Sequence, residues 1–175
     1  MGSAASESAR LETGNTRVEK AERLAHAIAQ QDAVLLTGAT TGLIYVVGKT
    51  AHDAGSFHIG ISPASNEYEH AGLYKLPLDA CDTLIYTGFG LKGRNVVLVR
   101  SCDIALFVAG AMGSLNEFTI AHDEGKVIGC LTGTGGVADE SEYLLQKFGK
   151  RGIAARVFQN EDPEKLINDC LNGLK

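Results

Sequence analysis

Short apolar runs alternate along the chain with longer segments in which apolar residues recur at helical spacing. The runs are too short for buried helices and predict strands at 33–37, 58–62, 83–87, 104–108, 127–131 and 154–158. Helical spacing predicts helices over 18–31, 43–54, 94–101, 114–124, 139–149 and 163–174. Residues 64–80 show weak periodicity and predict a loop with room for one helical turn.

This order of elements predicts an α/β fold. Short strands separated by helices are typical of βαβ units, in which helices cover both faces of a parallel sheet. We therefore expect a doubly wound, Rossmann-like parallel sheet in a three-layer α/β/α domain. Residues 16–175 are expected to form this single domain, after a flexible N-terminal segment of residues 1–15. Thr16 and Glu19 match a capping box, which predicts the start of the first helix.

Composition and charge exclude several classes of protein. The 175 residues carry a net charge of −5 without any basic block, so phosphate neutralisation of nucleic acid is not expected. No apolar run is long enough to cross a membrane, and the residues after Met1 lack a secretion signal, so we expect a cytoplasmic protein. Four widely spaced cysteines fit a reducing compartment, and the five histidines form no metal-binding pattern, so no metal is expected.

Glycine is abundant, with 21 residues, and it collects where strands are predicted to end. The clusters span 38–42, 88–93, 110–113 and 133–136. The carboxyl ends of parallel strands share one edge of the sheet, which is where ligands of such folds bind. Glycine there lets backbone N–H groups approach an anion at a helix N-terminus. The pattern favours a pocket for phosphate or another anion, although the tight turns of any α/β sheet also need glycine.

Two motif matches are rejected because of their context. Residues 88–93 (GFGLKG) have the form G-x-G-x-x-G, but the predicted helix is short and the next strand ends without the acidic residue of a dinucleotide site. Residues 42–50 resemble a P-loop, but the spacing is one residue too long and the intervening apolar residues belong in a helix. The sequence therefore implies neither a bound NAD nor a nucleoside triphosphate.

Arg94 and Glu117 are the strongest candidates for chemistry. Arg94 follows a glycine turn, and Glu117 is expected in the first turn of the helix after residues 110–114. The arginine could hold a phosphate, and the glutamate could contact a ribose hydroxyl or donate a proton. The structural alternatives are a capping box, Ser114 with Glu117, and an ordinary surface ion pair for Arg94.

Three separated stretches resemble one known family. They are residues 38–43 (GATTGL), residues 54–63 (AGSFHIGISP) and residues 94–117, which end in AGAMGSLNE. The chain is similar here to the Rossmann-like LOG family, often labelled "lysine decarboxylase-like", which also contains the molybdenum-cofactor carrier proteins. The PGGxGTxxE stretch of that family corresponds to residues 109–117, and the arginine that precedes it corresponds to Arg94.

The resemblance implies a doubly wound fold, a homodimer or larger homo-oligomer, and no cofactor. In the best-understood branch, the enzyme cleaves the N-glycosidic bond of a cytokinin nucleoside 5′-monophosphate. Carried over by position, the resemblance makes Arg94 and Glu117 catalytic. It assigns ligand and phosphate binding to Gly38, Thr40, Thr41, Gly42, Gly110, Ala111, Gly113 and Ser114.

Departures from the cytokinin branch favour a second hypothesis. This chain has Arg94-Asn95 where that branch has Arg-Lys, residues 109–111 (AGA) replace Pro-Gly-Gly, and Ser114 replaces threonine. These features and the short chain are more similar to the carrier branch. The chain is thus either a nucleoside 5′-monophosphate hydrolase or a non-catalytic carrier of a phosphate-bearing cofactor such as molybdopterin; a scaffold with purely structural glycines is a third interpretation. Lysine decarboxylation is rejected because no pyridoxal site is present.

The beginning of the sequence differs from the family as well. Family members begin with a strand that leads into a Gly-Ser turn, whereas this sequence begins Met1-Gly2-Ser3. That strand is central in a doubly wound sheet. Without it, we expect its neighbours to carry unpaired backbone groups, unless the sheet is rearranged.

Overall fold

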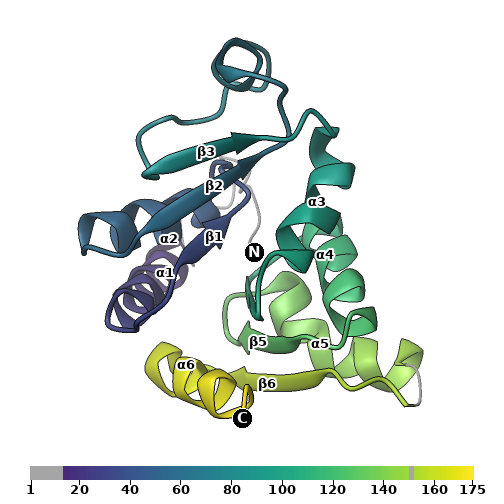
Figure 1. Ribbon diagram of the computed structural model, residues 1–175. Helices are drawn as coiled ribbons and strands as arrows, with labels where there is room; N and C mark the ends of the chain where they lie inside the picture. The colour runs from purple at the N-terminus through teal and green to yellow at the C-terminus, as the bar shows by residue number, and fades with distance from the viewer. Residues whose placement is uncertain (1–13, 150–151) are drawn as a thin grey trace.

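The computed structural model describes residues 14–149 and 152–175 (Figure 1). Its strands are β1 Leu35–Thr37, β2 His58–Ser62, β3 Thr83–Tyr86, β4 Ile104–Val108, β5 Val127–Leu131 and β6 Arg156–Asn160. Its α-helices are α1 Gly14–Ala29, α2 Leu43–Asp53, α3 Gly90–Arg100, α4 Met112–Asp123, α5 Gly136–Phe148 and α6 Pro163–Asn172. A short π-helix, η2 Glu69–Leu73, lies in the predicted loop. The predicted flexible segment falls on residues outside this description, apart from the start of α1.

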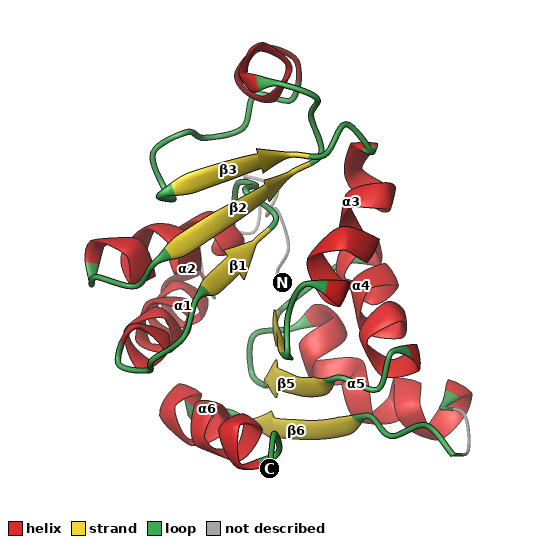
Figure 2. Cartoon of the chain, viewed as in Figure 1, coloured by secondary structure: helices red, strands yellow, loops and turns green. Residues whose placement is uncertain are grey.

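The predicted α/β fold class is confirmed. All strand pairs are parallel, and they form two three-stranded sheets, in the orders β1-β2-β3 and β4-β5-β6 (Figure 2). The strands match the apolar runs closely because a parallel strand covered on both faces needs a continuous run of apolar residues. β5, which is buried at all five positions, is the clearest case.

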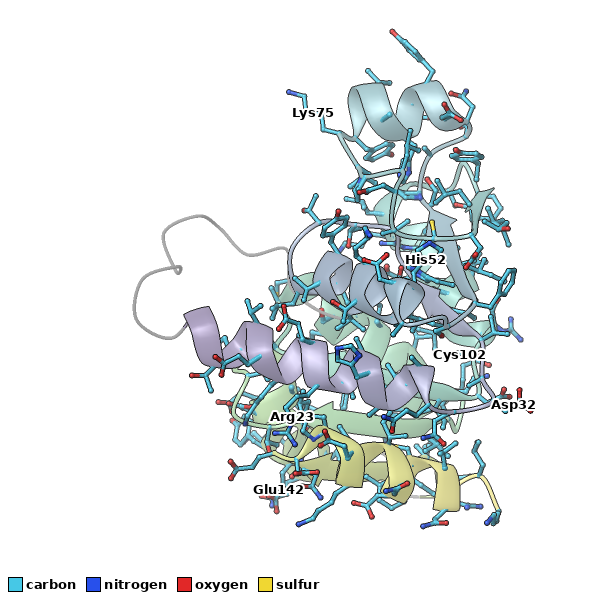
Figure 3. All side chains as sticks on the ribbon, turned by 90° about the vertical axis from the view of Figure 1, so that its left-hand side faces the viewer. Arg23, Asp32, His52, Lys75, Cys102 and Glu142 are labelled. Atoms are coloured by element: carbon cyan, nitrogen blue, oxygen red, sulfur yellow. The ribbon has the colours of Figure 1, made fainter. Side chains whose placement is uncertain are left out.

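Helices cover both faces of the two sheets. α2, α1 and α6 lie side by side on one face, as Figure 3 shows, and α1 contacts both of its neighbours. Arg23 of α1 binds Glu164 and Asp162 at the start of α6. α3, α4 and α5 lie on the opposite face (Figure 1), where α3 packs on α4 and on β2. α1 and α3 therefore bridge the two sheets, one on each face.

The sheet is divided between β1 and β4. Within the described residues, β1 pairs only with β2 and β4 pairs only with β5. The two sheets therefore turn the edges of β1 and β4 toward each other. No helix in the described part of the chain is long and apolar enough to cross a membrane.

Several helices begin earlier than the sequence predicts. α1 begins at Gly14, which places Thr16 inside the helix, so the predicted capping box does not mark its start. α3 begins at Gly90 and α4 at Met112, with Ala111 as its N-cap. Ser114 is thus inside α4, and Glu117 lies in the second turn. The capping-box explanation for Glu117 is therefore wrong.

The fourth glycine cluster has a packing role. Val137 N and Ala138 N donate to the carbonyl oxygens of Gly110 and Ala109, each at 3.0 Å, so the start of α5 rests on the turn after β4. Gly136 adopts a φ of 59°, and a Cβ at this position would overlap the carbonyl oxygen of Gly110. Glycine is needed here for two separate reasons.

We predict that Gly136→Ala destabilises the fold by about 3 kcal/mol or more, because backbone strain adds to a collision with main-chain atoms. Gly55→Ala is the matched control, since Gly55 has a φ of 93° and open space around its Cβ position. The control should cost only about 1 kcal/mol. Urea unfolding of both variants measures the difference, and equal losses would contradict the close approach.

Candidate functional site

A cavity of about 890 Å³ opens at the carboxyl ends of the strands and continues between the two sheets. Of the predicted site residues, those lining it are Gly38, Thr40, Arg94, Ala111, Gly113, Ser114 and Glu117. Thr41, Gly42 and Gly110 are not among its lining residues. We call the part bounded by Gly38, Thr40, Arg94, Asn95, Gly113, Ser114 and Glu117 the strand-end pocket.

Arg94 is the buried cation of this pocket. Only 5% of the residue is exposed, so the alternative of a surface ion pair is wrong. Its Nη1 donates to the carbonyl oxygen of Gly38, which directly follows β1, and to that of Ile61 in β2, the latter at 2.9 Å. Its Nε is buried and has no hydrogen-bond partner among the described residues. Burial lowers the pKa of Arg94, but an arginine in a protein remains charged.

Gly38 makes room for this guanidinium. A Cβ on Gly38 would overlap Nη1 of Arg94. No positive φ is involved at this position. The first glycine cluster therefore serves the pocket through close approach of the arginine rather than through an unusual backbone conformation.

Glu117 reaches the same pocket from α4 and is 7% exposed. Burial raises the pKa of its carboxyl group, and the positive charge of Arg94 partly opposes the shift. The carboxyl group consequently holds its proton to a higher pH than an exposed glutamate does. The structure thus brings Arg94 and Glu117 into one cavity, as the strand-edge argument predicts.

Asn95 is a pocket residue that the sequence analysis did not select. It is buried, and in the flipped amide orientation, which satisfies both of its polar atoms, its nitrogen donates to Glu117 Oε1 at 3.0 Å and to Leu91 O at 2.9 Å. The signal available in the sequence is an asparagine directly after Arg94 in a helix interior, where this residue type is unfavourable. Asn95 therefore positions the Glu117 carboxyl group from α3.

The N-termini of the helices near the pocket carry partial positive charge that no side chain neutralises within the described residues. α2, α3 and α4 each begin without a side-chain hydrogen bond at the N-cap and without an acidic residue in the first turn, as far as the described residues show. By contrast, α5 has Asp139 in its first turn, and Asp162 caps α6 by accepting from Lys165 N. Uncapped N-termini carry partial positive charge and free N–H groups, which suits an anion.

The backbone is strained where β1 and β4 end. Ala39 and Ala109 have φ values of 49° and 54°, a region that costs a non-glycine residue on the order of 1–3 kcal/mol. Each amide is held by a hydroxyl group: Ala39 N donates to Thr37 Oγ1 and Ala109 N to Thr134 Oγ1.

Within the described residues, no three His, Cys, Asp or Glu side chains lie close enough to hold a metal ion.

Comparison with known proteins identifies the family. The sequence profile of the SLOG cluster4 family matches residues 1–167. The chain belongs to the SLOG cluster4 family. An uncharacterized protein of Archaeoglobus fulgidus is 28% identical to this SLOG cluster4 protein over 153 residues, which cover 87% of this chain and 84% of that one.

Solved structures share the fold of this SLOG cluster4 protein. TM1055, a structural-genomics target, aligns with a TM-score of 0.83 at 19% identity, covering 98% of this chain and 96% of that one. The molybdenum cofactor binding protein of Rippkaea orientalis gives 0.69 at 24% identity, with coverages of 91% and 89%. The molybdenum cofactor carrier protein of Chlamydomonas reinhardtii gives 0.67 at 23% identity, with coverages of 98% and 96%. At these identities the likeness shows the fold.

We predict that Gly38→Ala destabilises the protein by about 1–3 kcal/mol, because the added methyl group displaces the Arg94 guanidinium. Arg94→Met removes the guanidinium and therefore tests the cause. In that background, the cost of Gly38→Ala should fall by about 1 kcal/mol or more. Denaturant unfolding of the two single variants and the double variant gives this coupling, and additive effects would show that the contact does not constrain Gly38.

We predict that Glu117→Gln changes how stability depends on pH. Because burial raises the pKa of Glu117, the folded chain keeps this proton at pH values where the unfolded chain has lost it. Native stability therefore falls as pH rises from the ordinary carboxyl pKa to the raised value. The glutamine variant lacks this loss, so its thermal midpoint should rise relative to the native one between pH 4 and pH 7. A difference between the two proteins that stays constant with pH would refute the buried carboxyl.

Proposed function

We propose that this protein binds a small phosphate-bearing ligand in the strand-end pocket and acts as a carrier of a pterin-type cofactor. The observation that carries the proposal is Arg94, a buried charge on the wall of a cavity, whose Nε has no hydrogen-bond partner in the part of the chain that the structure describes. A buried donor without a partner is costly, and an anion in the pocket would supply the acceptor.

The surroundings of Arg94 favour an anion as well. The uncapped starts of α3 and α4 border the same cavity, and Gly113 leaves open space at the first turn of α4. In this proposal the first-turn amides of α4 and the hydroxyl group of Ser114 hold the phosphate, opposite Gly38 and Thr40. Ala111, the N-cap residue, contributes main chain only.

The rest of the cavity suits a ring system. Its volume of about 890 Å³ is at the upper end of the range for small-molecule sites, roughly 300–1,000 Å³. Apolar side chains line much of it, including Ile44, Val47, Leu91 and Leu98. The carrier role is further supported by the shared fold with proteins described as binding or carrying molybdenum cofactor.

One observation favours a second candidate, hydrolysis of a nucleoside 5′-monophosphate at its N-glycosidic bond. Glu117 is a buried carboxyl group with a raised pKa in the same cavity as Arg94, which is the arrangement of a general acid beside a phosphate clamp. Arg94 would hold the phosphate and Glu117 would protonate the departing base. The two candidates share the phosphate site and differ in whether the ligand is turned over.

Binding is tested by isothermal titration calorimetry, in which the protein is titrated separately with molybdopterin, AMP and inorganic phosphate. We expect Arg94→Met to weaken binding of the phosphate-bearing ligand by about tenfold or more, because a charge-assisted hydrogen bond to phosphate is lost. Arg100→Met is the matched control, since Arg100 is exposed at the end of the same helix and does not line the cavity. Equal affinities in the two variants would overturn the proposal.

Gly113→Ala separates binding from stability. Gly113 is helical with open space around its Cβ position, so alanine should stabilise the fold by up to about 1 kcal/mol. The same methyl group enters the proposed phosphate site and should weaken binding.

Release of free base from AMP, abolished by Glu117→Gln, would favour the hydrolase, whereas binding of molybdopterin without turnover would favour the carrier.

A further inference from the structure

The two carbonyl groups that accept from Arg94 each lie next to a buried hydroxyl residue. Gly38, the first acceptor, follows Thr37, and Ile61, the second acceptor, precedes Ser62. Thr37 is the last residue of β1 and Ser62 is the last residue of β2, and both are buried. The position of the guanidinium group therefore depends on how these two strand ends are held.

Each of the two hydroxyl groups fixes the turn that follows its strand. Thr37 Oγ1 accepts from Ala39 N at 3.1 Å, and Ser62 Oγ accepts from Ala64 N at 3.0 Å. The Ala39 amide and the Gly38 carbonyl group belong to one planar peptide unit, so the first of these bonds also orients the carbonyl group. Since each hydroxyl oxygen accepts from the backbone, its proton is left to donate, and a buried donor without an acceptor is costly.

A buried histidine supplies the acceptor at both strand ends. His58 Nε2 lies 2.8 Å from Thr37 Oγ1, and His70 Nδ1 lies 2.8 Å from Ser62 Oγ. Both histidines are almost completely buried. Burial lowers the pKa of His58, which favours the neutral ring, and only a neutral ring has a nitrogen that can accept.

The second nitrogen of each ring fixes the position of the ring proton. His58 Nδ1 contacts the carbonyl oxygen of Ala80, and His70 Nε2 lies 3.0 Å from that of Pro77. A carbonyl oxygen only accepts, so these two nitrogens are the donors, and the opposite nitrogens accept from the hydroxyl groups. Both carbonyl groups belong to the connection between β2 and β3, which contains η2 (Figure 1).

The fold also provides room for the His58 ring. Gly48 is buried within α2, and a Cβ at this position would overlap Cε1 of His58. Glycine is unfavourable in the interior of a helix, and the space that the ring needs explains its presence here. The relation of Gly48 to His58 is thus the same as that of Gly38 to Arg94.

We propose that His58 and His70 are positioning residues for the strand-end pocket. Each histidine accepts from a strand-end hydroxyl group, each hydroxyl group holds a turn, and the two strand ends present the carbonyl acceptors of Arg94. Directed hydrogen bonds therefore run from the connection between β2 and β3 to the cation of the pocket. The effect on ligand affinity rests on the proposed function, whereas the directions of the hydrogen bonds do not depend on it.

The hydrogen-bond directions are tested in the protein without ligand. We expect nitrogen NMR of the imidazole rings to show opposite tautomers, with the proton of His58 on Nδ1 and that of His70 on Nε2. Thr37→Val should speed hydrogen exchange of the Ala39 amide about fivefold or more, because the amide loses its acceptor. The same tautomer in both rings, or unchanged exchange at Ala39, would overturn the proposal.

Titration with inorganic phosphate measures the effect on the pocket. Ser62 does not line the cavity, so Ser62→Ala removes no direct contact to a ligand. We expect this variant to weaken phosphate binding about fivefold, because the strand end that holds Arg94 loses a hydrogen bond. Ser141→Ala is the matched control, since the Ser141 hydroxyl group is also buried, donates to Ala138 O and accepts from Gln159 Nε2, but lies on α5 and does not line the cavity.

The outcomes separate this proposal from the proposed function. Equal phosphate affinities of Ser62→Ala and Ser141→Ala would show that the hydroxyl group of Ser62 has a structural role only, and would overturn the positioning role. Native protein that does not bind phosphate would contradict the proposed function, and the tautomers and the exchange of Ala39 would then decide whether the hydrogen bonds run as described.

Discussion

Burial of a single guanidinium group constrains the architecture around the pocket. Removing the Arg94 charge from water carries a penalty of several kcal/mol, which its carbonyl acceptors and the nearby Glu117 offset. The acceptors come from β2 and from the residue that follows β1, whereas Arg94 belongs to α3, which packs on α4. One side chain thus ties the first sheet to the helical layer of the second. The contact between Arg94 and the first sheet requires that Gly38 has no side chain.

The strands were predictable because their burial on both faces leaves a simple pattern in the sequence. β2, β4 and β5 have the predicted bounds, and β6 is shifted by two residues because its polar positions, such as Arg156, interrupt the apolar run. The split into two sheets could not be derived from periodicity. Each apolar run identifies a strand but not the strand with which it pairs, so the division into two sheets becomes evident only in three dimensions.

Helix starts were less predictable, and the reason bears on the site. Sequence rules place a helix start at a capping side chain, but α3 and α4 begin at glycine turns that have no such cap. The prediction therefore began both helices too late and misplaced Glu117 by one turn. Shared access of Arg94 and Glu117 to one cavity was predictable from the strand-edge rule, whereas the role of Asn95 depends on a contact between two helices that spacing does not encode.

The strained alanines after β1 and β4 have a consequence for how such a protein diversifies. Thr37 and Thr134 hold the amides of Ala39 and Ala109, and the turns fixed in this way lie next to main chain that lines the pocket, at Gly38 and Ala111. The shape of a pocket wall formed by main chain depends little on which side chains surround it. Under the proposed function, substitutions in the apolar wall would change which ring system fits, while the main-chain contacts to the phosphate would stay the same. A shared fold would then predict that a ligand is bound through its phosphate, but it would say less about the rest of the ligand.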